Sequence, residues 1–398
     1  MDVIMGKKLI ITKLNQKIIS SLFDENDLVQ INVEKEEENS LLGNIYVGKV
    51  KNIVKNINAA FVEIEHGQMC YLSLSEVKHA IFTKENKTEQ VRIGDELIVQ
   101  ISKEDVKTKA PVVTTDINLT GKYVVLVHGK PGIGVSNKVE SDKDRKRLRK
   151  LLEPYISGQY GFIIRTNASL VSEELIKNEI EVLLKLYEDI KNYGIYRLRF
   201  SKVYQTPKAY ICSIRDGLSH EIESFITDDT FMYSEIKEYL ETYQKEDLHK
   251  LKLYSDPMLP LIKLYGIETK LENALKEKVW LKSGGNLIIQ PTEALTVIDV
   301  NTSKAVTGKK NVEETFFKLN LEAAKEIAKQ IRLRNLSGII IVDFIDMKKE
   351  ENKECLLNTL NEYLKQDPVK TMLIDMTALN LVEITRKKIR KPLYEQIK

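Results

Sequence analysis

The alternation of apolar and polar segments is clearest in the last third of the chain. Two stretches, ALTVIDVN from Ala294 and GIIIVDFIDM from Gly338, are apolar enough to predict buried strands. The segment between them predicts a long helix over residues 313–335, which we expect Gly338 to terminate. Its apolar residues recur at intervals of four and three and form one stripe: Phe317, Leu321, Ala324, Ala328 and Ile331.

A further helix and strand follow this region. Leu356, Leu357, Leu360 and Leu364 are spaced to face one side of a helix, and TMLID, from Thr371, predicts another strand. Strands that alternate with helices in this way predict a layered α/β domain with a largely buried sheet.

The first third has a different pattern, with short runs typical of strands. Residues 8–35 predict two short strands joined by a turn at DEND. From Leu42, strand-sized runs alternate with glycine and asparagine, which predicts a small β-barrel. These runs are NIYVGKVKNIV, NAAFVEIEHG, MCYLSL and IGDELIVQISK.

The middle of the chain mixes both patterns. We expect a charged helix from Ser141 to Leu152 and a longer helix that begins after Ser172, a residue suited to cap it. KAYICSI, from Lys208, predicts a strand, and ALKEKVWL, from Ala274, is compatible with a short helix or a strand.

Composition bounds the class of protein. The chain has 398 residues, 42% of them hydrophobic and 30% charged, which predicts a soluble protein of roughly two to four domains. No apolar run approaches the ~18 residues of a membrane span, and the start does not resemble a signal peptide, so we expect a cytoplasmic protein without membrane association. The net charge of +3 means that any nucleic-acid surface must be local.

The basic runs and the cysteines give little information about function. The runs SDKDRKRLRK and RKKIRK are basic, but charge runs are usually solvated faces. Cys70, Cys212 and Cys355 form no Cys-x-x-Cys pair, so we expect free core thiols and no zinc site.

Two aspartates stand out because each ends a strongly apolar run. Asp343 follows Asp299 by 44 residues, a spacing that fits a strand, a crossover helix and the next parallel strand. The two carboxylates would then lie about 4.8 Å apart and repel each other, unless a divalent cation binds between them. Mg²⁺ prefers such oxygen ligands together with water and phosphate, so the pair predicts a metal site for a phosphodiester.

Other interpretations of these residues remain open. An aspartate at the end of a strand often caps a turn or a helix, and we favour that interpretation for Asp346, which precedes a predicted helix. Asn301 carries no charge, but it could orient a carboxylate or donate a hydrogen bond to the scissile phosphate.

Two longer segments resemble a known family. SGGNLIIQPTEALTVIDVN and EETFFKLNLEAAKEIAKQIRLRNLSGIIIVDFIDM resemble the catalytic region of the bacterial ribonuclease E/G endoribonucleases, and the resemblance extends more weakly from the N-terminus to about Pro392. It implies Mg²⁺-dependent cleavage of single-stranded, AU-rich RNA to 5′-monophosphate products, in the processing of ribosomal RNA and the decay of messenger RNA. By the same resemblance Asp299 and Asp343 bind Mg²⁺, for which Mn²⁺ can substitute, and Asn301 supports catalysis.

The resemblance also implies a multidomain α/β architecture. An S1 barrel of the OB type would span residues 41–118 and a 5′-sensor α/β subdomain residues 119–205. An RNase H-like subdomain would combine residues 1–40 and 206–278, and a DNase I-like catalytic domain would follow over residues 279–398.

Further RNA contacts are implied outside the catalytic region. Phe61, Tyr71 and Lys109 match residues of the barrel that contact RNA; without the resemblance, Phe61 would be interpreted as barrel core. Arg165 and Thr166 match the residues that bind a terminal 5′-monophosphate, with Val125 contributing its backbone. Without the resemblance, we would expect a surface ion pair at Arg165.

The chain departs from the family pattern in three places. Asn137 stands where sensors often have a basic residue, and residues 378–380, Ala-Leu-Asn, replace Arg-Phe-Gly. The Cys-x-x-Cys zinc link is absent, so we expect no zinc-bridged dimer, although a homodimer held by other contacts remains open. The length is nearer the ribonuclease G type. The alternatives are a catalytically inactive RNA-binding protein with the same fold and, less favoured, a metal-dependent DNase.

Overall fold

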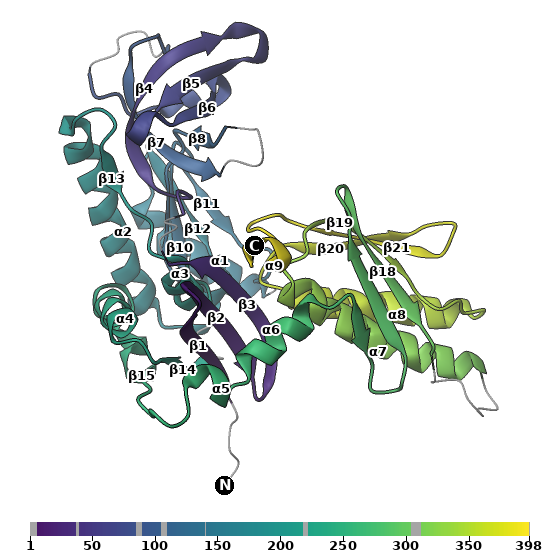
Figure 1. The fold of residues 1–398 in the computed structure, drawn as a ribbon. Coiled ribbons are helices and arrows are strands. Elements are labelled where there is room, and N and C mark those ends of the chain that lie inside the picture. Colours follow the sequence, from purple (N-terminus) through teal and green to yellow (C-terminus); the bar gives the residue numbers. More distant parts are fainter. Residues whose placement is uncertain are drawn as a thin grey trace. The chain divides into compact units, whose positions relative to one another are not determined.

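The chain folds into two compact units. The computed structural model describes residues 6–36, 40–84, 90–104, 110–139, 141–217, 222–303 and 312–397. The first unit combines Met1–Glu36, Ile222–Ser234 and Lys250–Lys398, and the second combines Glu37–Glu221 and Glu235–His249 (Figure 1). Segments far apart in the sequence therefore build each unit.

The first unit contains a small mixed sheet in the order β15-β14-β1-β2-β3. Strands β1, β2 and β3 form an antiparallel meander, and β14 and β15 add to it in parallel. The sequence predicts only two strands here, which is wrong, because Asn15 and Gln16 have positive φ and form a tight turn between β1 and β2. The strands span Lys7–Leu14 (β1), Lys17–Asp24 (β2), Asp27–Lys35 (β3), Ile222–Thr227 (β14) and Leu251–Leu253 (β15).

Short helices cover this small sheet. Leu261 of α5 and Leu271 of α6 pack with Ile10, Phe23 and Ile31 of the strands in one apolar core. Each such side chain contributes roughly 1.5–3 kcal/mol when it is fully removed from water. The helices span Leu261–Leu264 (α5), Ile267–Leu275 (α6) and, near the C-terminus, Leu393–Gln396 (α9).

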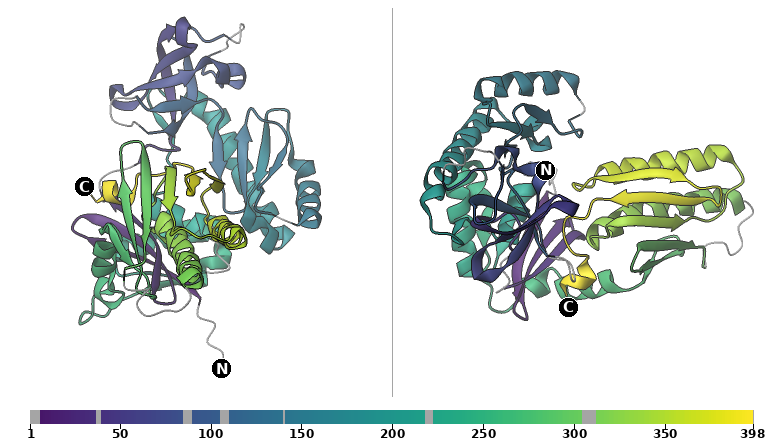
Figure 2. Two further views of the ribbon diagram at one scale, coloured as in Figure 1. Left: turned by 90° about the vertical axis from the view of Figure 1, so that its right-hand side faces the viewer. Right: turned by 90° about the horizontal axis from the view of Figure 1, so that it is seen from above.

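A larger sheet of the first unit has the order β16-β17-β18-β19-β21-β20. Two long helices, α7 (Val312–Leu333) and α8 (Glu350–Lys365), lie together against one face of it (Figures 1 and 2). In the part of the first unit that the structure describes, its other face carries no helix. The strands span Lys278–Trp280 (β16), Asn286–Pro291 (β17), Leu295–Asn301 (β18), Gly338–Asp343 (β19), Thr371–Met376 (β20) and Leu381–Arg386 (β21).

The long helix α7 confirms the predicted element but corrects its details. Ala324 and Ile331 of the predicted stripe are buried, whereas Phe317, Leu321 and Ala328 are only partly buried at the edge of the core. The fully buried face is completed by other residues: Leu319, Ala323 and Ile327. Gly338 does not end the helix.

Asn335 terminates α7 instead. It adopts a left-handed conformation with a φ of 50°, and the backbone amide of the next residue, Leu336, bonds back to the carbonyl of Ile331. This is the pattern that closes many helices, and asparagine tolerates it better than most residues other than glycine.

The second unit contains a closed barrel. Strand β4 pairs with both β5 and β7, so the order β4-β5-β6-β8-β7 closes on itself (Figure 2). This confirms the predicted barrel. Its strands span Ile45–Val54 (β4), Ala59–Glu63 (β5), Met69–Ser73 (β6), Glu96–Lys103 (β7) and Val112–Thr114 (β8), and β13 (Lys202–Tyr204) pairs with the edge of β4.

The rest of the second unit is an α/β layer with the sheet order β11-β12-β10-β9. The predicted charged helix is α1, whose N-cap Ser141 accepts a hydrogen bond from the Asp144 amide, and the longer helix α2 begins after Ser172 as predicted. The elements span Asn118–Thr120 (β9), Val124–His128 (β10), Ile133–Val135 (β11), Tyr160–Ile164 (β12), Asp142–Leu152 (α1), Glu173–Tyr193 (α2) and Ala209–Asp216 (α3). Helix α4 (Thr230–Tyr243) has its first residues in the first unit and the rest in the second.

Three predictions from local composition are wrong. KAYICSI forms helix α3 and not a strand, because Tyr210, Ile211 and Ile214 all pack inward at helical spacing. Cys355 is exposed, since it lies on the solvent side of α8, whereas the other two cysteines are buried. Arg386 of the basic run is not solvated: it is 4% exposed, and its Nε donates to Asp367 Oδ2 at 2.7 Å.

The remaining elements of the described residues are short 3₁₀ turns. They span Lys55–Ile57, Glu65–Gly67, Leu74–His79, Glu153–Tyr155, Thr166–Leu170, Gly194–Tyr196 and Lys245–Lys250. Among the helices of the described residues, none combines the length and the apolar character that crossing a membrane requires.

Candidate active site

The carboxyl ends of two parallel strands meet at one edge of the larger sheet. In the register of β18 and β19, Asp299 lies directly opposite Asp343. Neighbouring strands are about 4.8 Å apart and paired residues project to the same face, so the two carboxylates lie side by side. The predicted placement of the two aspartates on parallel neighbouring strands is confirmed.

Strand alternation directs these carboxylates away from the helices. Ile298 and Val300 of β18 are buried in the core under α7, whereas Asp299 and Asn301 alternate with them onto the opposite face. Asp343 is exposed at the end of β19. Apolar strands thus hold the acidic groups at a surface that a metal ion and a polyanion can reach.

The two carboxylates interact electrostatically. Partial burial, together with the negative charges of Asp299 and Asp346, raises the pKa of Asp343 above its usual range. Like charges at this distance favour protonation of one carboxyl unless a cation offsets them. The charge arrangement therefore favours a bound divalent ion.

Asn301 orients one member of the pair. Its Nδ2 donates a hydrogen bond to Asp299 Oδ2 at 2.6 Å, and both residues lie on the same face of β18. A hydrogen bond to an ionised acceptor is among the stronger ones in proteins, so it fixes the carboxylate rotamer. Of the two roles that the sequence leaves open for Asn301, the structure supports orientation of a carboxylate.

Asp346 does not cap the following helix, so that prediction is wrong. Helix α8 begins at Glu350 without a side-chain cap from the preceding residues, and Glu313 of α7 instead accepts hydrogen bonds from the amides of Lys348 and Lys349. Asp346 accepts a hydrogen bond from Asn380 Nδ2 at 3.3 Å. Asn380, the last of the residues 378–380 that depart from the family pattern, thus contacts the acidic end of the site.

Asn380 is suited to this position by its backbone conformation. Its φ is 60°, in the left-handed region where glycine and asparagine are favoured over other residues. Asparagine at this position adopts the backbone conformation that the turn requires, as glycine would. It also carries a side-chain amide, which donates the hydrogen bond to Asp346.

The two carboxylates suit a hard divalent cation that takes only a few of its ligands from the protein. No group of three or more His, Cys, Asp or Glu side chains gathers in a metal-binding arrangement within the described ranges. Mg²⁺ is commonly held by one or two carboxylates, with waters and substrate phosphate completing its octahedron. Asp299 and Asp343 match that pattern.

The barrel presents the two aromatic residues predicted to contact RNA. Phe61 of β5 pairs directly with Tyr71 of β6, and the rings meet edge to face with centroids 6.4 Å apart. Both are partly exposed, whereas their neighbours Ala60 and Leu72 are buried in the barrel. The interpretation of Phe61 as barrel core is therefore wrong. Lys109 lies outside the described residues.

Arg165 and Thr166, the predicted sensor residues, follow strand β12. Arg165 Nη2 donates to Asp216 Oδ1 at 2.9 Å, and its Nη1 donates to the Gly121 carbonyl at 2.5 Å. Thr166 Oγ1 lies 3.2 Å from Ser136 Oγ, next to Asn137. Burial alone would raise the pKa of Asp216, but Arg215 and Arg165 lower it, so this carboxylate stays ionised and holds Arg165.

The strand that carries Val125 is anchored by a partly buried acid. Glu179 of α2 accepts hydrogen bonds from the backbone amides of Tyr123 and Val124, each at 2.8 Å. Gly121 approaches so closely that a Cβ there would lie 2.4 Å from the Glu179 carboxyl carbon, so a larger residue would displace the carboxylate from these amides. Val125 and Arg165 are therefore positioned by the same structural network.

Two further residues lie on the face that carries the carboxylates and were not predicted from the sequence. Residues 274–281 contain the end of α6 and the edge strand β16, which carries Lys278 and Trp280. Their side chains alternate with that of Val279, which packs against the core. The alternation Lys-Val-Trp before a glycine turn is the only signal in the sequence, and three residues are too few to distinguish a strand from a helix.

Comparison with known proteins identifies relatives over nearly the whole chain. The family model described as the ribonuclease E/G family matches residues 118–389, and the model of the S1 RNA binding domain matches residues 42–116. Ribonuclease G of Haemophilus influenzae is 37% identical over 383 residues, which cover 94% of this chain and 78% of that protein. For ribonuclease G of Escherichia coli K12 the identity is 36% over 378 residues, which cover 92% and 77%. Ribonuclease E of the same strain is 32% identical over 401 residues, which cover 98% of this chain and 38% of that protein.

Proposed function

The chain belongs to the ribonuclease E/G family, and from this premise we propose that it is an endoribonuclease whose Asp299 and Asp343 bind Mg²⁺. The observation that carries the proposal is the register that sets these two carboxylates side by side on the open face of the sheet. The substrate is single-stranded, AU-rich RNA, and the products carry 5′-monophosphates. The same activity serves the processing of ribosomal RNA and the decay of messenger RNA.

Each residue of the site has its own role in hydrolysis. Asp299 and Asp343 hold the ion, and Asn301 fixes the Asp299 carboxylate through its 2.6 Å hydrogen bond. When bound, Mg²⁺ lowers the pKa of a bound water and offsets charge that develops on the phosphate. The open face around the pair admits a single strand from solvent.

The barrel binds the strand at a second place. The partly exposed rings of Phe61 and Tyr71 offer faces on which bases stack, and such stacking does not depend on base identity. We assign Lys109 to a phosphate contact from the same barrel.

The finer domain assignments belong to the same proposal. We assign residues 41–118 to the S1 domain and residues 279–398 to a DNase I-like catalytic domain. The pairing of β1 with β14 in one sheet supports a single RNase H-like subdomain built from residues 1–40 and 206–278. Residues 119–205 then form the 5′-sensor subdomain.

Cleavage in the presence and absence of metal tests the proposal directly. We expect the full chain to cut a fluorescent, 5′-monophosphorylated AU-rich oligomer with Mg²⁺, to cut it with Mn²⁺, and to stop when EDTA removes the ion, because the carboxylates alone supply no electrophile. Gel separation of the products measures this. An RNA that binds but is never cut with either ion would instead support the inactive RNA-binding protein.

A substitution at Arg165 tests the sensor. We expect Arg165→Ala to lower kcat/KM for 5′-monophosphorylated RNA about tenfold or more, because a guanidinium binds phosphate oxygens in pairs. For 5′-hydroxyl RNA we expect a smaller loss. The ratio of the two rates cancels any general effect of losing the contact with Asp216. An equal loss on both substrates would remove the sensing role.

A further inference from the structure

The register of three strands places Lys278 and Trp280 in line with the acidic pair. Lys278 of β16 is paired with Ile288 of β17, which is itself paired with Asp299 of β18. In the same way, Trp280 is paired with Asn286, which is paired with Asn301. Directly paired residues project to the same face of a sheet. Lys278 and Trp280 therefore lie on the face that carries Asp299 and Asp343, two strand spacings or about 10 Å from β18.

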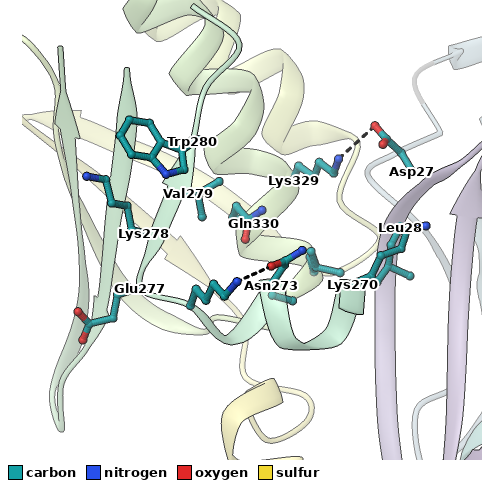
Figure 3. Close-up of a pocket in the computed structure, with 13 residues that line it drawn as sticks. Asp27, Leu28, Lys270, Asn273, Glu277, Lys278, Val279, Trp280, Lys329 and Gln330 are labelled. Carbon is teal, nitrogen blue, oxygen red and sulfur yellow. Dashed lines mark hydrogen bonds and ion pairs between the residues drawn. The ribbon is translucent and has the colours of Figure 1, made fainter. Parts of the chain in front are cut away.

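Trp280 is exposed, although tryptophan is usually buried. Its exposed fraction is 60%, and Lys278 Nζ lies 4.2 Å from the centroid of its ring, where the cation interacts with the π electrons (Figure 3). Lys278 lies over one face of the ring, and the exposed fraction shows that much of the rest of the side chain is open to a stacked group.

A basic pocket adjoins this pair on the side away from the carboxylates. Its volume is about 810 Å³, and Trp280 and Lys278 form part of its wall (Figure 3). Of the charged residues that line it, Lys270, Lys276, Lys278 and Lys329 outnumber Asp27 and Glu277. One of the acids, Asp27, is already paired with Lys329 at 3.2 Å.

We propose that Trp280 and Lys278 form a nucleotide-binding subsite for the RNA strand whose scissile phosphate lies at Asp299 and Asp343. One base stacks on the free face of Trp280, Lys278 binds its phosphate, and the strand continues over the edge of β16 into the lysine-lined pocket. This inference rests on the proposed function and adds a substrate contact to it.

Charge and chemistry favour a nucleic acid over another occupant. An aromatic ring beside lysines is the combination that single-strand binding proteins use, because bases stack and phosphates pair with ammonium groups. A second copy that docked through the same face would bring the same positive charges against these lysines and be repelled.

The fluorescence of Trp280 offers a direct test, because it is the only tryptophan in the 398 residues. We expect the emission of the full chain to change, and its quenching by iodide to fall, as a single-stranded AU-rich oligomer binds in EDTA. Fluorescence anisotropy of a labelled oligomer measures binding independently. Unchanged emission at saturating RNA would overturn the subsite.

Kinetic variants test whether the contact serves catalysis. We expect Trp280→Ala to lower kcat/KM by about 5-fold to 100-fold, the range for loss of one stacked base, and Trp280→Phe to retain most of the activity. Lys278→Ala should reduce the slope of log affinity against log salt by about 0.7, the value for one phosphate contact with a single strand. Met372→Ala is the matched control, because Met372 is 41% exposed on the opposite edge strand of the same sheet.

The outcomes separate this inference from the proposed function. If the wild type cuts RNA but Trp280→Ala behaves like Met372→Ala, the subsite is wrong and the nuclease stands. If emission responds to RNA but nothing is cut with any ion, the nuclease is wrong, and of the subsite only the binding of RNA at Trp280 stands. If emission changes with protein concentration alone, together with self-association in sedimentation, a second copy covers this face and the subsite is wrong.

Discussion

Replacing Asp299 with asparagine is expected to reduce kcat at least about a thousandfold while leaving the fold intact. The substitution keeps the shape of the side chain and its place beside Asn301, but it removes a charge from the pair that lies opposite Asp343 in the register. A catalytic metal supplies several kcal/mol of transition-state stabilisation, which corresponds to that loss of rate. Single-turnover cleavage with saturating enzyme measures kcat directly.

The control for this prediction lies in the same sheet. Asp375 is an exposed carboxylate on the edge strand β20, two strand spacings or about 10 Å from β19 and so too far to bind the same ion, and Asp375→Asn should change kcat by less than about twofold. If both variants retained wild-type rates, the two aspartates would not be the metal site.

Stability provides an independent readout of the same substitution. The pKa of Asp343 is raised, so the folded protein binds its proton more tightly than the unfolded chain, and the free energy of unfolding falls as pH rises through that range. Burial is the largest cause of the raised pKa, and removing the charge of Asp299 relieves only the part of the cost that this charge contributes. In EDTA near pH 7 we therefore expect Asp299→Asn to melt at or above the wild-type temperature, whereas added Mg²⁺ should stabilise only the wild type.

The placement of the aspartate pair could be predicted from the sequence because its signals are local. Buried parallel strands appear as continuous apolar runs, so the charged residues that end them, Asp299 and Asp343, are conspicuous. The spacing between the runs fits one crossover helix, and the structure contains it as α7. The strand–helix–strand order and the positions of Asp299 and Asp343 thus followed from the same pattern of apolar runs.

Features that depend on register or tertiary packing could not be predicted in this way. The alignment of Trp280 with Asn301 requires two successive antiparallel pairings, and no short run of residues encodes either of them. A short apolar run is equally compatible with a strand and a buried helix, which is why α3 was assigned to the wrong class. The hydrogen bonds from the amides of Lys348 and Lys349 to Glu313 join segments about 35 residues apart, and only the folded chain brings them together.

Substitution of Lys122 is expected to have the largest effect on stability. The Lys122 side chain is 1% exposed, and its Nζ forms ion pairs with Asp247, which is 4% exposed, and with Glu246 at 3.0 Å. Tyr123, the next residue, donates its hydroxyl to the same Glu246 carboxylate at 2.5 Å. Lys122→Met keeps the length of the side chain but leaves the buried carboxylate of Asp247 without its ammonium partner.

We expect Lys122→Met to lower the free energy of unfolding of the second unit by about 3–5 kcal/mol, the usual cost of breaking a buried pair from one side. Urea unfolding followed by far-UV circular dichroism measures the change, while Trp280 emission reports separately on the first unit. Lys130→Met is the control, because Lys130 pairs with Asp116 at 2.9 Å but is 68% exposed, and its loss should cost less than about 1 kcal/mol. Equal effects of the two substitutions would show that burial adds nothing to the Lys122 pair, whereas restoration of stability by Asp247→Asn in the Lys122→Met background would identify the unpaired acid as the cause.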